Sequence, residues 1–285
     1  MMAFLRWYAR WPLWLLHGLG WALGWLTVAL SPTYRRRLWA NARLAGVSPA
    51  DTRAAVGEAG RMVTELPWLW LAPPGRRVAD WVEWRGAEWI DWALGQGKGM
   101  LLMTPHLGTF ELCAQAYAER FGDRATLTAL YRPARKPWLK TLQETSRARA
   151  GLDTAPASLL GVRQMMRALR KGQVVGLLPD QVPPDGLGVW APFFGQNAYT
   201  MTLSARLLAQ TGAVPLLMWC ERRAWGRGWV LHVFNPLDGA DPATPVDPAR
   251  VNAWMEGLIR QRPGQYLWGY HRFKQPRGLP PELKA

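Results

Sequence analysis

The sequence predicts an α/β fold, in which a mixed sheet is flanked by helices and preceded by an N-terminal membrane-anchoring helix. Short apolar runs alternate with helical stretches beyond residue 100, which is typical of a largely parallel or mixed sheet. Residues 11–30 form a long uncharged segment near the N-terminus. A chain of 285 residues is also long enough to bury a sizeable core. We therefore expect a membrane anchor over 1–31 and one α/β domain over 32–285.

The uncharged segment reads "WPLWLLHGLGWALGWLTVAL" and has about the length that a helix needs to cross roughly 30 Å of hydrocarbon. A cleaved signal peptide is the main rival, but no A-x-A site follows, and "SPTYRRRLWANAR" is a poor flank for export. More arginines follow the segment than precede it, which favours a cytoplasmic location for the bulk of the chain. A helix lying in the membrane interface stays open, because Pro12, His17 and several glycines dilute the hydrophobicity.

The elements of the domain follow from apolar periodicity and from turn residues. Ser48 and Pro49 are typical of an N-cap and first helical residue, so a helix is expected from there to about Leu71, where "APPG" ends it. Further helices are expected at 110–121, 137–149, 159–172, 200–212 and 248–262. Strands are expected at 100–104, 125–131, 173–179, 214–220 and 228–234.

Composition limits the class of partner. The formal charge is +15, with 29 Arg against 6 Lys, so an anionic partner is expected: nucleic acid, phosphate-bearing lipid or an acidic protein. Twelve of the 19 tryptophans precede residue 93, and Trp with Arg suits a membrane interface, although a GC-rich genome would also enrich both. No nucleic-acid motif is present, so we expect membrane lipids and not nucleic acid as partners. Cys113 and Cys220 lie in apolar runs and are expected to be buried and reduced.

One short stretch has the pattern of a catalytic site. In "MLLMTPHLGTFE", His106 follows a strand and Glu111 lies in the first turn of the next helix, at the edge of the sheet where α/β enzymes bind ligands. On one regular helix, side chains five residues apart point about 140° apart. His106 and Glu111 can therefore meet only if the helix begins after His106. Pro105, Gly108 and Thr109, the last as a cap, permit this. The two residues can then be interpreted as a catalytic base and the carboxylate that orients it. The alternative interpretation is an ordinary helix start with a polar residue at its edge and no catalytic role.

Two further segments supply polar groups beyond strands. The Gly- and Pro-rich stretch 177–200 is expected to be a long loop, and loops of that length inside a compact domain are usually functional. Arg132 directly follows another strand, where its guanidinium could bind a phosphate or lie solvated at the surface. The candidate pocket residues of the loop are Asp180, Gln181, Phe194, Gly195 and Thr200.

Four blocks in order, "HLGTFE", "YRP", "LLPDQVPP.G..V.APFFG..A.T" and "YLWGYHRFK", resemble the lipid A biosynthesis acyltransferases, the late lauroyl- and myristoyl-transferases of Gram-negative bacteria. The resemblance covers nearly the whole chain. It implies a glycerol-phosphate-acyltransferase-like α/β fold at the inner membrane, with the catalytic domain on the cytoplasmic side. It also implies acyl transfer from acyl carrier protein to a hydroxyl of a lipid A precursor, with no metal or organic cofactor. By resemblance, His106 and Glu111 are the catalytic pair, while Arg132 and Asp180 fall in substrate-binding blocks. The family accepts Asp or Glu at the position of Glu111.

The expected mechanism is direct transfer. His106 takes the proton of the acceptor hydroxyl as it attacks the thioester, and Glu111 holds the tautomer. The oxyanion would be stabilised by backbone N–H groups near Gly108 or in the 193–196 turn. A serine acyl-enzyme is not expected because G-x-S-x-G is absent, and Cys113 is expected to be too buried for a nucleophile.

The alternatives concern the acceptor and the basic surfaces. A glycerophospholipid acyltransferase would usually carry a Pro-Glu-Gly-Thr block, where this chain has "LLPDQVPP", and another glycolipid such as a phosphoinositol mannoside stays possible. A metal site at the His–Glu pair lacks a third ligand. The basic segments 132–140, with Arg147 and Arg149, and 163–171 are expected to bind either the acidic carrier protein or anionic headgroups. His17 and His232 are expected to be structural or exposed.

Overall fold

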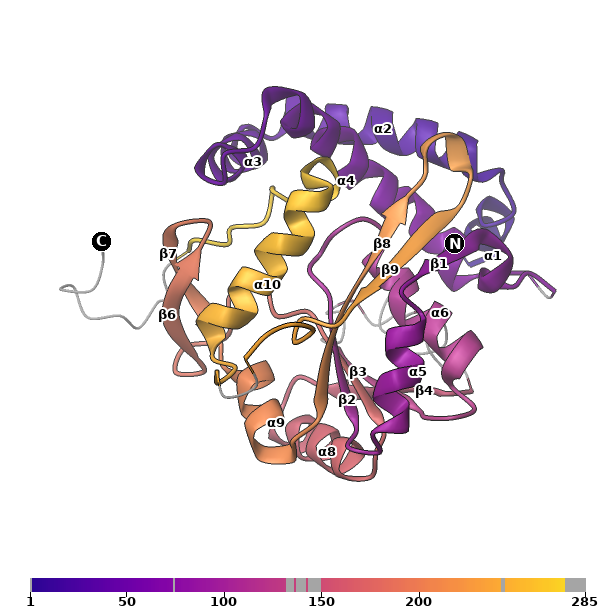
Figure 1. Ribbon diagram of the computed structural model, residues 1–285. Helices are drawn as coiled ribbons and strands as arrows, with labels where there is room; N and C mark the ends of the chain where they lie inside the picture. The colour runs from indigo at the N-terminus through magenta and orange to yellow at the C-terminus, as the bar shows by residue number, and fades with distance from the viewer. Residues whose placement is uncertain are drawn as a thin grey trace.

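The core of the protein is one seven-stranded sheet with the strand order β1-β9-β8-β2-β5-β3-β4 (Figure 1). The computed structural model describes residues 2–73, 75–131, 136, 142, 150–241 and 244–274. Every neighbouring pair in the sheet is parallel except β8 and β9. The predicted α/β fold with a mixed sheet is therefore confirmed. The strands are β1 (Val82–Arg85), β2 (Met100–Met103), β3 (Leu127–Tyr131), β4 (Leu152–Pro156), β5 (Val174–Leu177), β8 (Val214–Arg222) and β9 (Trp229–Phe234).

Helices cover both faces of the sheet, which explains why its central strands are apolar on both sides. Along β2, Leu101 and Met103 belong to one core cluster, and Met100 and Leu102 belong to the other. The first cluster includes residues of α8 (Leu159–Arg170), α9 (Leu203–Thr211) and α10 (Pro248–Gln261). The second includes residues of α5 (Glu88–Gly95) and α6 (Phe110–Phe121). Successive side chains of a strand point to opposite faces, so β2 contributes equally to both cores.

The N-terminal region forms four helices: α1 (Met2–Tyr8), α2 (Leu13–Leu30), α3 (Pro32–Leu44) and α4 (Pro49–Trp70). The start of α4 is as predicted, with Ser48 Oγ accepting from the backbone N–H of Asp51 at 3.0 Å. Of the described residues, α2 alone is long and apolar enough to cross a membrane, and a third of it is buried in the protein. Figure 1 shows α2 lying against α4.

Glycines allow α2 and α4 to approach until their backbones touch. A Cβ on Gly60 would overlap the carbonyl oxygen of Gly20, and a Cβ on Gly24 would overlap that of Val56. Small residues at such crossings let helices pack closely. Away from this contact α2 exposes large apolar side chains: Trp14, Leu19, Trp21, Leu23, Leu26 and Leu30.

The structure corrects the expectation of a long loop over 177–200. Its second half forms β6 (Gly188–Phe193) and β7 (Gln196–Met201), an antiparallel hairpin outside the main sheet. Phe194 and Gly195 make the two-residue turn, and both have positive φ, 49° and 73°, as such turns require. The sequence conceals this hairpin, because the turn lacks an Asn-Gly pair and Pro192 interrupts the first strand.

Other element boundaries also differ from the prediction. The helix expected from residue 200 begins at Leu203, because β7 continues to Met201. The sequence misses β1, α5 and β4; the two strands are short, and the exposed positions in each weaken the apolar pattern. The helix expected over 137–149 falls almost wholly outside the described residues.

Candidate active site

His106 and Asp180 meet beyond the carboxyl edge of the sheet. Met103 of β2 is the register partner of Leu177 of the adjacent parallel strand β5, and each polar residue follows three positions later. Asp180 Oδ1 lies 2.8 Å from His106 Nδ1, and Asp180 Oδ2 accepts from the backbone N–H of His106 at 3.0 Å. The carboxylate therefore holds both the backbone and the ring of the histidine.

The hydrogen bonds define the tautomer of His106. Burial alone would raise the pKa of Asp180, but the charge of His106 and hydrogen bonds from its ring, its backbone and Tyr266 lower it below its usual value. Asp180 is thus an ionised acceptor, so Nδ1 carries the proton. The side-chain amide nitrogen of Gln181, which only donates, lies 3.0 Å from Nε2. In the tautomer with its proton on Nδ1, a neutral imidazole would accept this hydrogen bond at Nε2, and a general base requires that tautomer.

Tyr266 completes this triad and is a residue that sequence reasoning missed. Its hydroxyl donates to Asp180 Oδ2 at 3.1 Å, and Leu267 N–H donates to the carbonyl oxygen of His106 at 3.2 Å. Burial raises the pKa of Tyr266 well above its usual value, so it remains a donor. Its only sequence signal is its place at the start of "YLWGYHRFK". The ring of Phe110 lies beside the imidazole, with centroids 4.7 Å apart.

Glu111 lies where the sequence places it, in the first turn of α6, and is half-buried. The helix begins at Phe110, after His106, as a His106–Glu111 pairing requires. The Nδ1 partner described above is, however, Asp180, a residue predicted for substrate binding. An orienting role of Glu111 stays a prediction.

The remaining predicted residues lie apart from this triad. Thr200 is fully buried in β7, where its hydroxyl contacts Asn252 and Arg272 at 2.8 and 2.9 Å. Phe194 and Gly195 form the hairpin turn, and the Phe194 ring packs against Trp268. Arg132 lies outside the described residues. Substrate binding by these four positions stays a prediction.

Two of the backbone N–H groups in the segments expected to stabilise the oxyanion already have acceptors within the protein. The N–H of Gly108 donates to the carbonyl oxygen of Gln265 at 3.0 Å, and the N–H of Phe194 donates to Glu256 Oε1 at 2.7 Å. Gly108 has a φ of +59°, and a Cβ there would overlap the carbonyl oxygen of Cys220. The glycine thus serves the tight loop between His106 and α6 rather than an oxyanion site.

The buried thiol of Cys113 is poorly suited to act as a nucleophile. Burial raises the pKa of Cys113 to about 12, so the thiol stays protonated at neutral pH, where it is unreactive. Within the ranges that the structure describes, no three His, Cys, Asp or Glu side chains cluster as candidate metal ligands.

An apolar cavity lies between the N-terminal helices and Gln181, the residue that contacts His106. Its volume is about 340 Å³, and it lies between α2, α4 and the segment 267–270, with Gln181 in its wall. Leu23, Met62, Val63 and Leu267 are among its apolar lining residues. Because Gln181 also contacts His106 Nε2, the cavity extends to the residue beside the base.

A histidine ring held by a buried carboxylate, near an apolar cavity and an apolar N-terminal helix, is an arrangement suited to proton transfer on a lipid substrate. The family model described as "Bacterial lipid A biosynthesis acyltransferase" matches residues 1–275, and the chain belongs to this family. It is therefore an acyltransferase family enzyme, and the family implies a lipid A precursor as acceptor.

Individual relatives support the same assignment. The chain is 32% identical to the lipid A biosynthesis lauroyltransferase of Escherichia coli (strain K12), over 78% of this chain and 70% of that protein. It is 27% identical to the lipid A biosynthesis palmitoleoyltransferase of the same organism, over 74% and 66%. It is also 28% identical to the phosphatidylinositol mannoside acyltransferase of Mycobacterium tuberculosis (strain ATCC 25618 / H37Rv), over 69% of this chain and 63% of that protein.

Proposed function

We propose that this protein transfers a fatty acyl chain from acyl carrier protein to a hydroxyl of a lipid A precursor, on the cytoplasmic side of the inner membrane. The observation that carries the proposal is the imidazole of His106, with Nδ1 bound to Asp180 and Nε2 in contact with Gln181, which lines the apolar cavity. A base in that tautomer activates a hydroxyl without a covalent enzyme intermediate.

The chemistry balances as a direct transfer. His106 Nε2 takes the proton of the acceptor hydroxyl while the hydroxyl oxygen attacks the carbonyl carbon of the thioester. The tetrahedral intermediate collapses, the C–S bond breaks, and the imidazolium returns the proton to the leaving thiolate. Asp180 stabilises the imidazolium between these steps, and general base catalysis of this kind contributes about 10²–10⁴-fold. Gln181 occupies the position facing Nε2, so its amide must move when the acceptor hydroxyl binds.

The exposed apolar face of α2 supports membrane attachment. Exposed aromatic rings continue onto α1, with Phe4 and Trp7, and α3 adds exposed Arg35, Arg36 and Arg37. Trp and Arg together suit the headgroup region. We expect carbonate extraction to leave the full-length protein in the membrane pellet. Complete recovery in the wash would exclude an embedded segment.

The helix α8 supports the acyl carrier protein as donor. Arg163, Arg167, Arg170 and Lys171 recur at three- and four-residue steps, and all four are exposed. An acidic carrier would find complementary charge there. The other predicted basic segment, 132–140 with Arg147 and Arg149, lies almost wholly outside the described residues.

Lipid analysis tests the proposal directly. Deletion of the gene should remove one secondary acyl chain from lipid A, read as a mass difference of the extracted lipid. A second candidate acceptor is another glycolipid, because a phosphatidylinositol mannoside acyltransferase is among the relatives. Unchanged lipid A together with loss of an acyl chain from a different glycolipid would favour that candidate.

A further inference from the structure

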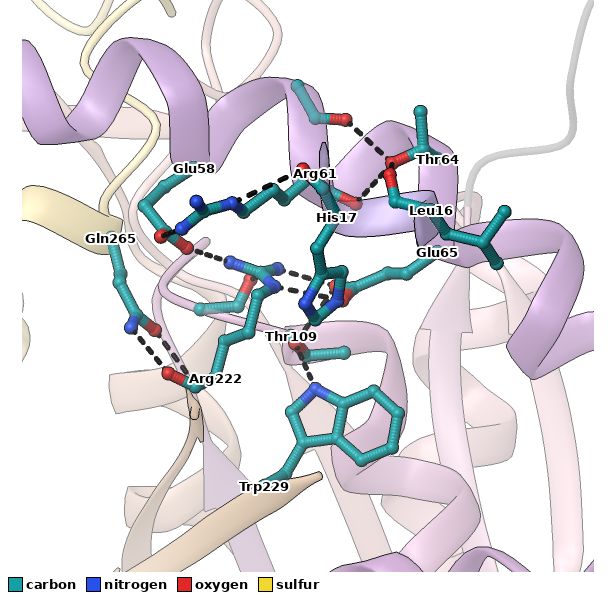
Figure 2. A network of polar contacts seen from close by, with 12 residues as sticks. Leu16, His17, Glu58, Arg61, Thr64, Glu65, Thr109, Arg222, Trp229 and Gln265 are labelled. Carbon is teal, nitrogen blue, oxygen red and sulfur yellow. Dashed lines mark hydrogen bonds and ion pairs between the residues drawn. The ribbon is translucent and has the colours of Figure 1, made fainter. Parts of the chain in front are cut away.

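The loop that carries His106 packs against a buried cluster of charged side chains. Figure 2 shows Arg222 of β8 between two carboxylates of α4, Glu58 and Glu65, with Thr109 of the loop beside Glu65. The guanidinium of Arg222 also reaches the carbonyl oxygen of Gly108 at 3.3 Å. Both Glu65 and the Arg222 side chain are almost fully buried, at 0% and 1% exposure.

Glu65 is the centre of this cluster, which we call the Glu65 cluster: His17, Glu58, Glu65, Thr109 and Arg222. Its carboxylate accepts from Arg222 Nε at 2.8 Å and from Arg222 Nη2, from Thr109 Oγ1 at 2.9 Å, and from His17 Nε2 at 3.1 Å. Burial alone would raise the pKa of Glu65, but the charge and hydrogen bonds of Arg222 and the contact with His17 lower it. It is therefore an ionised acceptor of four hydrogen bonds.

Thr109 is the link between the cluster and the catalytic loop. It stands at the N-cap position of α6, where a threonine hydroxyl ordinarily accepts from the helix backbone, but it makes no such bond here. Instead it donates to Glu65, and it accepts from the indole N–H of Trp229 at 2.7 Å (Figure 2). Its backbone N–H donates to the carbonyl oxygen of Cys220 at 2.9 Å. The residue is three positions from His106 and is fixed from three sides.

The cluster also reaches the apolar helix α2 through His17. This histidine is buried, and Arg61 Nε donates to its carbonyl oxygen at 3.4 Å while Thr64 Oγ1 donates to that of Leu16 at 2.8 Å. Gly20 of α2 and Gly60 of α4 pack without space for a Cβ on either residue. Because His17 of α2 contacts Glu65, a displacement of α2 would act on Glu65.

From this geometry we infer that Glu65, together with Arg222 and Thr109, holds the His106 loop in the position that catalysis needs. We further infer that His17 couples the apolar helix α2 to this support. The inference rests on the proposed role of His106 as the base. A hydrophobic replacement for a buried ion pair often stabilises a protein, so stability alone gives little reason for this cluster. Misplacement of a base by about 1 Å costs on the order of 100-fold in rate, which a rigid support prevents.

An isosteric pair of variants at Thr109 tests the link. Thr109→Val keeps the shape of the side chain but removes the hydroxyl between Glu65 and Trp229, whereas Thr109→Ser keeps the hydroxyl. We expect Thr109→Val to lower kcat about 10- to 100-fold with unchanged KM for both substrates. Thr109→Ser should recover most of that loss. A purely structural hydroxyl would instead lower Tm and leave kcat per folded molecule unchanged, and that outcome would overturn the inference.

The coupling between α2 and the His106 loop is tested by His17→Leu. This variant removes the hydrogen bond to Glu65 but keeps α2 apolar. We expect kcat to fall about threefold to tenfold, with the fraction bound to membranes unchanged. The matched control is His232→Leu, which removes a His–Glu hydrogen bond of 3.0 Å to Glu221, outside the Glu65 cluster. The control should retain wild-type kcat. Equal turnover of His17→Leu and wild type would show that α2 is not coupled to the loop.

A spectroscopic readout separates this inference from the proposed function. The chain has four histidines, so the ring ¹⁵N signals of detergent-solubilised, histidine-labelled protein are few enough to assign with His106→Gln. The His106 signals should shift in Thr109→Val and His17→Leu but not in His232→Leu. If they stay unchanged in all three, the positioning role is wrong, whatever the substrate. If wild type transfers no acyl chain to a lipid A precursor while these shifts occur, only the proposed function fails.

Discussion

Asp180 lies 2.8 Å from the imidazole of His106 because the two residues extend equally far beyond paired positions of neighbouring parallel strands. Neither residue is near the other in sequence, yet one register, Met103 with Leu177, aligns them. The arrangement makes Asp180 the group that fixes the ring, and in the proposed mechanism Asp180 also balances the charge of the imidazolium.

Asp180→Asn should lower kcat by about 10²–10⁴-fold, because the charge that stabilises the imidazolium is lost and the tautomer is no longer fixed. The KM values should change little. Steady-state kinetics with purified protein measures this, and circular dichroism checks that the fold is retained. A kcat within a few-fold of wild type would remove Asp180 from the mechanism.

Glu111→Ala should lower kcat less than His106→Ala does, because the imidazole and its bond to Asp180 survive. A negative charge in the first turn of α6 also favours the helix, so Tm should fall slightly. Kinetics and thermal melting of Glu111→Ala beside Glu111→Gln separate the two effects. A loss as large as that of His106→Ala would mean that Glu111 takes part in the chemistry itself.

The Glu65 cluster should make stability depend on acid pH. The folded-state pKa of Glu65 is lowered, so its stabilisation is fully present above the unfolded value of roughly 4.3 and is lost as pH falls through the folded pKa. Glu65→Gln should therefore lower Tm at pH 7, and the difference from wild type should shrink as the pH falls below about 4. Thermal melts across that range measure it. A Tm difference that is constant with pH would contradict the assignment of an ionised, stabilised Glu65.

Much of the fold was predictable, because it depends on local patterns. The buried strand at 100–103, the helix beginning after His106 and the cap at Ser48 all follow from apolar runs and from turn residues. The β6–β7 hairpin was not predictable, because Phe194 occupies a left-handed position that sequence rules reserve for Gly or Asn.

The site was predictable only in part, for a related reason. His106 and Asp180 were both identified, but their pairing requires knowing that β5 lies beside β2, which the chain order does not reveal. Glu111 is the nearer carboxylate in sequence and was therefore expected as the partner. Tyr266, Glu65 and Arg222 come from distant segments and carry no motif, so their contacts with the His106 loop needed the folded structure.

Charge reversal on α8 tests the donor surface. Arg163→Glu with Arg167→Glu should raise the KM for acyl carrier protein several-fold and leave that for the lipid acceptor unchanged, with the effect weakening as salt rises. The matched control is Arg35→Glu with Arg36→Glu on α3, also exposed, which should weaken vesicle binding but not the donor KM. A defect in acceptor KM for the α8 variant would assign that face to the membrane instead.

Turnover of His106→Ala tests the central claim most directly. Purified wild-type and variant proteins are incubated with acyl-loaded carrier protein and a lipid A precursor, and the product is measured by mass spectrometry. His106→Ala should be folded, should retain membrane attachment, and should transfer at less than about one hundredth of the wild-type rate. Transfer by folded His106→Ala at close to the wild-type rate would contradict the role of His106 as the base.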